Sequence, residues 1–262
     1  MKKLFGVLAT LLAAMIASPL LAGVILHQEI TTSNGANTTT SHRTVMVQGN
    51  KQKVETGEQS IILDLDAGKM ILLSPASRTY TELPFPPHGQ MAAMMQNMGG
   101  VNLNFTKTGK TKKLSGYPCQ EYDSSAKSAM GEFSARGCFS SAAPGAAAYA
   151  SFSQTMARKF EEAGMAKTRG MQPDGIPMEL ETTTKLRGFN IPGIPPEQAE
   201  RLKQMMANRP PTTTKSVTTS VKVAELPPDT FGIPADYTER KVALGGLGMG
   251  APAPAPTPYE GE

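Results

Sequence analysis

The sequence predicts a mainly β protein of the α+β class, in which a curved antiparallel sheet resembles a half-barrel and carries two to three amphipathic helices on its concave face. Three observations predict this fold. Much of the chain alternates apolar and polar residues with the period of half-buried strands. Turn residues separate these segments as they do in hairpins. Two segments repeat apolar residues at helical spacing, and a sheet of about seven to ten strands would curl enough to receive them.

The N-terminus has the layout of a secretory signal peptide. A basic start at Lys2 and Lys3 precedes an almost wholly apolar run over 4–21, and small residues follow from Ala22. A retained anchor is the alternative, because about 18 apolar residues reach the lower limit for spanning a bilayer. A proline near the end of the run favours cleavage, and the absence of a nearby Cys argues against a lipid anchor. We predict a signal peptide at 1–22 and a periplasmic or secreted protein, not an integral membrane protein after cleavage.

Strands dominate the segment 23–242, which we predict to be a single domain. Turn chemistry at 33–37 and at 66–69 predicts hairpins at these two places. The predicted strands are 24–32, 44–54, 61–65, 70–73, 78–83, 112–122, 132–139, 177–187 and 212–226.

Helical periodicity marks 146–164 and 195–206, and a Pro- and Met-rich insertion at 84–100 could supply a third helical segment. Gly164 ends the first helix, and a Pro-Pro-Glu start opens the second. The apolar stripes are Tyr149, Phe152, Met156, Phe160 and Ala163 in the first, and Ala199, Leu202, Met205 and Met206 in the second. The Gly- and Ala-Pro-rich segment 243–262 is typical of a disordered tail or stiff linker.

The two cysteines predict a structural disulfide, because exported proteins meet oxidising conditions. If Cys119 lies opposite Cys138, the segment forms a hairpin that turns near 128–129 and places Glu121 opposite Arg136. Directly opposed residues are close enough for a disulfide. A redox-active pair is the alternative, but catalytic dithiols usually lie close in sequence. We therefore predict a bond that stabilises the fold.

Four stretches of the sequence stand out together, at 61–70, 108–122, 175–180 and 223–237. They resemble the bacterial envelope family catalogued as domain of unknown function 4412, over most of residues 24–240. Cys138 stands where we expect an aromatic residue in many relatives, so the resemblance does not itself imply the disulfide. More loosely, the expected fold is similar to the half-barrel of periplasmic lipoprotein carriers such as LolA and LolB. That similarity implies an apolar concavity for acyl chains or for a hydrophobic partner, and it supplies no catalytic residues.

Charge and motif patterns argue against several function classes. Lys and Arg number 26 against 22 Asp and Glu, and two of the lysines lie in the signal peptide. The densest basic run, 107–113, lacks interleaved aromatic residues, so it suits a solvated strand edge better than a nucleic-acid site. Gly109-Lys110-Thr111 lacks the earlier glycine of a phosphate-binding loop, and the three histidines fit no hydrolase spacing. We expect neither enzymatic activity nor a cofactor.

A cluster of methionines is the feature of the sequence that most specifically suggests a ligand chemistry. His88, Met91, Met94, Met95 and Met98 lie within one short segment, at spacings that place the thioethers on one face of a helix. Thioethers select Cu(I). They also form adaptable apolar surfaces, and we favour that interpretation.

The leading hypothesis is an exported, non-enzymatic protein that binds a hydrophobic ligand or an envelope protein partner in an apolar concavity. A Cu(I)-binding or copper-buffering envelope protein is the second hypothesis. A structural envelope module without a ligand is the third. The expected ligand-lining residues are Met91, Met94, Met95, Met98, Leu202, Met205 and Met206.

Overall fold

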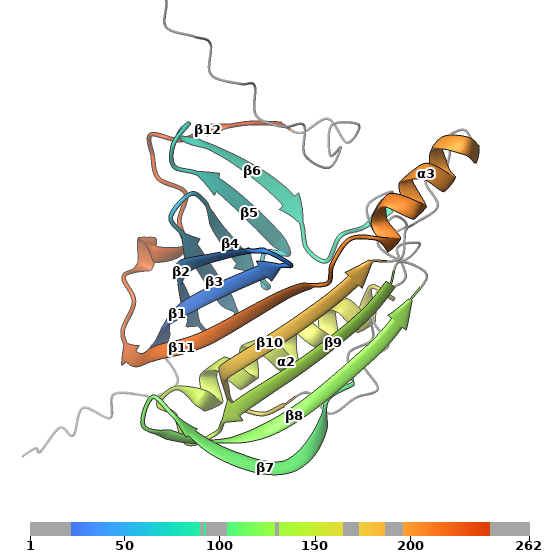
Figure 1. Ribbon diagram of the computed structural model, residues 1–262. Coiled ribbons are helices and arrows are strands. Elements are labelled where there is room, and N and C mark those ends of the chain that lie inside the picture. Colours follow the sequence, from blue (N-terminus) through green and yellow to red (C-terminus); the bar gives the residue numbers. More distant parts are fainter. Residues whose placement is uncertain are drawn as a thin grey trace, which may run out of the picture.

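The computed structural model describes residues 22–89, 92, 104–128, 131–164, 173–186 and 196–241 (Figure 1). Within them the strands form a single sheet of twelve, in the order β12-β6-β5-β4-β3-β2-β1-β11-β10-β9-β8-β7. Neighbouring strands are antiparallel, except that β12 runs parallel to β6. The strands are β1 (Gly23–Asn34), β2 (Asn37–Gln48), β3 (Lys51–Thr56), β4 (Ser60–Asp64), β5 (Lys69–Ser74), β6 (Thr79–Pro84), β7 (Thr106–Leu114), β8 (Tyr117–Ser128), β9 (Gly131–Ser140), β10 (Ile176–Leu186), β11 (Thr212–Ala224) and β12 (Thr238–Glu239).

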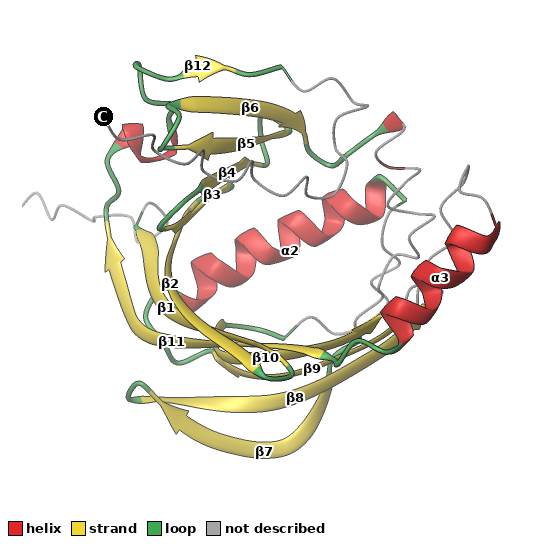
Figure 2. Cartoon of the chain, turned by 45° about the horizontal axis from the view of Figure 1, so that its top comes forward, coloured by secondary structure: helices red, strands yellow, loops and turns green. Residues whose placement is uncertain are grey.

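The sheet curves around helix α2 (Ala146–Glu162), which lies across its concave face (Figure 2). The predicted curved antiparallel sheet is therefore confirmed. The predicted two to three helices on that face are not, because α3 (Pro196–Ala207) lies beyond the ends of β9 and β10 in both views. None of the described helices has the length and apolar composition needed to cross a bilayer.

Apolar side chains pack on both faces of the sheet. The larger core lies between the concave face and α2, and Phe152 of the helix is almost fully buried in it. A smaller core forms on the other face of β4 and β5, because Ile62 alternates with its neighbour Leu63. Residues from the C-terminal segment cover this smaller core, namely Phe231 of the 3₁₀ helix η1 (Pro228–Phe231), Ile233 and Tyr237.

Two predicted strands each contain a turn. The segment 44–54 divides into β2 and β3 at Gly49, whose φ of +58° suits the first position of a two-residue hairpin turn. The segment 112–122 divides into β7 and β8 at Ser115 and Gly116, which both have positive φ. The predicted turns at 33–37 and 66–69 are confirmed.

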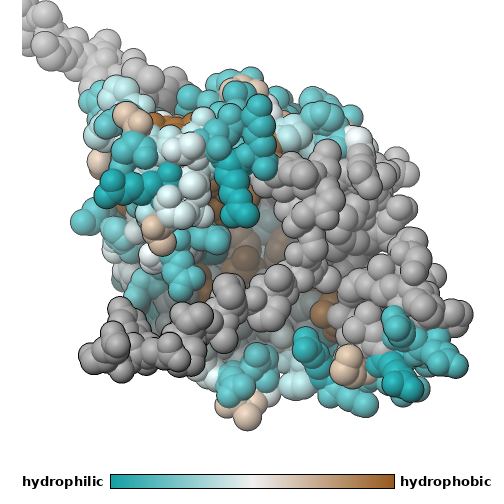
Figure 3. Space-filling view, turned by 90° about the horizontal axis from the view of Figure 1, so that it is seen from above, coloured by the Kyte–Doolittle hydropathy of each residue, from teal (hydrophilic) through white to brown (hydrophobic). Residues whose placement is uncertain are grey.

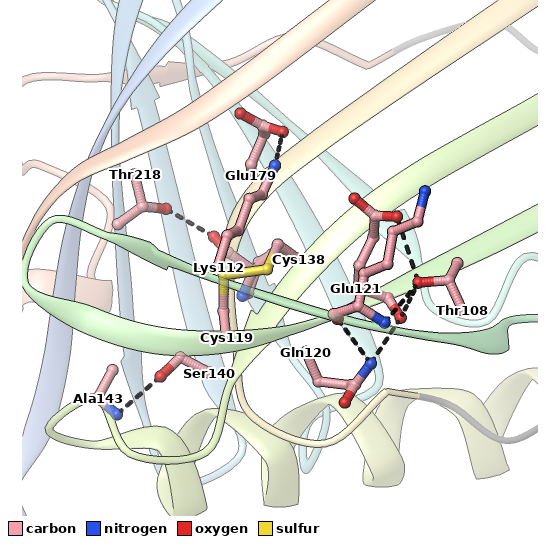
Figure 4. The surroundings of a disulfide bond; sticks show 12 residues. Thr108, Lys112, Cys119, Gln120, Glu121, Cys138, Ser140, Ala143, Glu179 and Thr218 are labelled. Carbon is pink, nitrogen blue, oxygen red and sulfur yellow. Dashed lines mark hydrogen bonds and ion pairs between the residues drawn. A yellow bond between two sulfur atoms is a disulfide. The ribbon is translucent and has the colours of Figure 1, made fainter.

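The disulfide between Cys119 and Cys138 is confirmed, with 5.4 Å between the two Cα atoms (Figure 4). The predicted register of the hairpin is wrong by two residues, since Glu121 and not Cys119 lies opposite Cys138. A shift of two keeps each side chain on its face of the sheet, which is why the pairing survives the error. Asp123 takes the place predicted for Glu121 and binds Arg136, with 2.7 Å between Oδ1 and Nε.

Candidate ligand-binding site

Helix α2 is held against the concave face by the loop that precedes it and by an aromatic contact near its C-terminal end. The loop after β9 is fixed where the N–H of Ala143 donates to Oγ of Ser140 at 3.2 Å. Gly145 then precedes the helix with a φ of +76°. At the other end, the rings of Phe160 and Phe85 meet edge to face with 4.9 Å between their centroids. The helix therefore spans the concavity and packs against β1, β2 and β10.

An apolar row runs across the concave face beside the helix. The register of β2 to β5 aligns Val45, Val54, Ile61 and Leu72 directly opposite one another on successive strands. Val45 is buried and Val54 and Leu72 are half-buried, but 38% of Ile61 is exposed. Ile61 shares its face with Leu63, a member of the core under α2, so its exposed surface opens into the concavity.

The surface agrees with this arrangement. Figure 3 shows a hollow in the face seen from above, with hydrophobic residues at its bottom and mostly hydrophilic residues along its upper and left sides. Large exposed apolar side chains are few in the described residues, namely Ile61, Met205 and Val223. Ile61 is the one that belongs to the apolar row.

A polar network lies next to the apolar row on the same face. Arg43 of β2 donates from Nε to Oε1 of Gln28 at 2.6 Å and from Nη2 to Oγ of Ser216 at 3.4 Å. Gln28 donates from Nε2 to Oγ1 of Thr218 at 3.0 Å, and that hydroxyl donates to the carbonyl oxygen of Pro177 at 2.7 Å. Gln28, Ser216 and Thr218 are buried, so strands far apart in sequence hold the Arg43 guanidinium in place.

The charge of Arg43 has no counter-ion in the described residues. Its hydrogen-bond partners are an amide and a hydroxyl, and no described Asp or Glu forms an ion pair with it. Burial lowers the pKa of the Arg43 guanidinium, and the nearby Tyr149 of α2 partly opposes this. Burial likewise raises the pKa of the Tyr149 hydroxyl. The concavity thus combines an open apolar row with one cation at its side.

Four of the seven predicted ligand-lining residues are not described by the structure, and the other three belong to α3. Met91, Met94, Met95 and Met98 lie outside the described residues, as do residues 1–21 of the predicted signal peptide and the predicted tail. Leu202, Met205 and Met206 belong to α3, which stands away from the concave face. Of these three, the structure describes only the side chain of Met205, which is 64% exposed.

His88, the remaining member of the predicted copper set, is exposed in the segment after β6. Within the described residues, no three His, Cys, Asp or Glu side chains come together in a way that could hold a metal ion.

Sequence reasoning missed Arg43 and Ile61. A signal for Arg43 was present, since Arg43, Val45 and Val47 occupy alternate positions of one strand and therefore share a face. A cation at a position that the pattern assigns to the core is unusual unless it is paired. Ile61 gave no comparable signal, because its exposure depends on where α2 lies.

The sequence from 29 to 187 matches the family model described as Domain of unknown function (DUF4412). The chain belongs to this family. The DUF4412 region includes Arg43, the whole apolar row, the disulfide and α2, and it ends before β11. The curated proteins contain no match to the chain.

Three solved structures illustrate what the DUF4412 chain is similar to. PNGF-II shares 10% identity with a TM-score of 0.37 over 85% of this chain, which spans only 31% of that one. A putative outer membrane lipoprotein-sorting protein domain from Vibrio parahaemolyticus shares 9% identity with a TM-score of 0.32, over 80% of this chain and 89% of that one. A LolA superfamily protein from Nitrosomonas europaea shares 10% identity with a TM-score of 0.29, over the same shares of the two chains.

Proposed function

We propose that the protein is exported and that its concave face binds an apolar ligand, either the acyl chain of a lipid or lipoprotein or an apolar segment of a partner, without catalysing a reaction. The exposed Ile61 in the apolar row carries the proposal. Exposed apolar surface in a concave site loses contact with water when a ligand binds, and the free energy gained scales with the area covered. The disulfide supports export, because such bonds persist in oxidising compartments.

Substitution of Ile61 tests the proposal. Ile61→Lys places a charge in the apolar row at a position exposed enough to tolerate it in the folded protein. We expect the affinity for the uncharged dye Nile red, measured by its fluorescence, to fall about tenfold or more, since an apolar ligand would bury that charge.

Val223→Lys is the matched control. Val223 is 46% exposed and, by its pairing with Val24, faces the same side of the sheet on β11, away from the apolar row. It should leave dye binding unchanged. An equal loss of dye affinity in both variants would contradict the proposal. So would wild-type protein that binds neither the dye nor, in native mass spectrometry, any lipid of the cell envelope, and either result would favour a structural module.

Copper binding stays a prediction. The four methionines that would supply the thioether ligands lie outside the described residues, and His88 alone does not make a site.

A further inference from the structure

We propose that Arg43 binds the oxyanion head group of the ligand, so that the concave site selects an anionic amphiphile, a long apolar chain that ends in a carboxylate or a phosphate. This inference rests on the function proposed above. It names the chemical class of the ligand and the residue that recognises its head.

Among the described residues, no carboxylate forms an ion pair with the guanidinium of Arg43. Removing a guanidinium from water is costly unless an opposite charge compensates it, and neutral partners such as Gln28 and Ser216 do not supply that charge. Outside the described residues, the sequence contains carboxylate side chains only at Glu260 and Glu262. The described part of the chain therefore leaves the guanidinium charge for a ligand to neutralise.

The guanidinium of Arg43 is held in a fixed orientation, and some of its N–H donors have no acceptor among the described residues. Two of its N–H groups bind Gln28 and Ser216, and the other three have no acceptor among the described residues. Gln28 is itself held by Thr218, so the orientation of the fork is set before a ligand arrives. A planar fork of this kind binds a carboxylate or phosphate through two parallel hydrogen bonds.

The guanidinium of Arg43 adjoins the apolar row. Arg43 and Val45 lie two residues apart on one face of β2, and the row continues from Val45 to Leu72 across three strand spacings. At about 4.8 Å per strand, the row is about 14 Å long. A ligand whose head group binds Arg43 can therefore place its apolar chain against Val54 and Ile61.

Comparison of ligands that share a chain and differ in the head tests the proposal. Dissociation constants of the full-length mature protein are measured for palmitate, hexadecyl phosphate and the uncharged hexadecanol. Acetate and inorganic phosphate serve as heads without chains, and we expect neither to compete at millimolar concentration. Wild-type protein should bind the two anions more tightly than the alcohol by about tenfold to a hundredfold, the range of a hydrogen bond to a charged group.

The test variant is Arg43→Met. The matched control is Arg136→Met, at an exposed arginine of β9 that forms an ion pair with Asp123. Arg43→Met should remove the preference for the anions and leave hexadecanol binding within about threefold, whereas Arg136→Met should change neither. If Arg43→Met retains the preference, or if wild-type protein binds anion and alcohol equally, the proposal is overturned while the apolar site stands.

Failure of wild-type protein to bind any of the three chains overturns both proposals. Should Arg43→Met fail to fold, the wild-type preference and the variant Arg43→Lys decide the matter. Lys keeps the charge without the fork, and we expect it to retain part of the preference.

Discussion

At the scale of single residues, the entry into α2 depends on a glycine with two separate constraints. Gly145 adopts a φ of +76°, in the left-handed region that a residue with a Cβ enters at a cost of about 1–2 kcal/mol. A Cβ at this position would also lie 2.9 Å from side-chain atoms of Val24 in the core. Such overpacking costs typically about 1–3 kcal/mol more.

We therefore expect Gly145→Ala to lower the free energy of unfolding by about 2–5 kcal/mol, measured by urea denaturation. Gly109→Ala separates the two constraints, because Gly109 has a φ of +81° and nothing within 4 Å of its Cβ position. Gly109→Ala should lower the free energy of unfolding only by the cost of the left-handed backbone conformation, about 1–2 kcal/mol. Equal losses in the two variants would show that contact with Val24 contributes nothing.

Arg43 shows why the cation of the candidate site could not be assigned from the sequence. Alternation places it on the inward face of its strand, but its partners Gln28 and Ser216 become neighbours only through the order β2-β1-β11. No local pattern encodes that order. The absence of a counter-ion likewise follows from the positions of all the described acidic residues at once.

At the scale of elements, three strands are joined on the convex face by one carboxylate. Oε1 of Glu179 of β10 accepts a hydrogen bond from Nζ of Lys112 of β7 (Figure 4). Nζ of Lys215 of β11 lies 3.2 Å from Oε2 of the same carboxylate. Burial raises the pKa of the Glu179 carboxyl, and the hydrogen bonds and charges of the two lysines lower it by more, so its pKa lies below the ordinary value.

This shift predicts a pH dependence with a definite sign. Because the folded protein depresses the pKa of Glu179, the stabilising contribution is present above the unfolded value of about 4.3 and disappears as the pH falls through the folded value. Glu179→Gln should be less stable than wild type at pH 7, by about 1 kcal/mol or less given solvent screening, and the difference should shrink towards pH 3.

Urea denaturation at a series of pH values measures this difference. Glu181→Gln, at an exposed position on the same strand and face, is the control and should track wild type throughout. A Glu179→Gln deficit that stays constant with pH would argue against the ion pairs as its origin.

The elements differ in how well the sequence encodes them. Helix α2 was predictable because five apolar residues repeat at helical spacing and Gly164 follows them. The turn at Gly49 was not predictable. A two-residue turn shifts the alternation of apolar and polar residues by one position, but β3 has Val54 as its single apolar residue, so the shift does not show in the sequence. For α3, periodicity indicates which face is apolar and says nothing of what that face packs against.

At the scale of the whole molecule, an open sheet of this size has two edges to protect. Strand β7 carries lysines and an irregular register at one edge, both of which discourage pairing with another chain. At the other edge, the C-terminal segment returns past the outer core and adds β12 to β6. Its N–H groups at Thr238 and Arg240 donate to the carbonyl oxygens of Arg78 and Tyr80 at 3.0 and 2.7 Å.

If β12 protects the edge strand β6, then a substitution that detaches β12 should expose β6 without shortening the chain. Arg240→Pro eliminates one of the two donors, whereas Arg240→Ala keeps it and removes the same side chain. We expect the proline variant to associate with increasing concentration in sedimentation velocity, because β6 then presents unpaired backbone groups at the edge of the sheet. The alanine variant should remain like wild type. A proline variant that sediments like wild type at every concentration would mean that the edge strand β6 does not need β12 to prevent association.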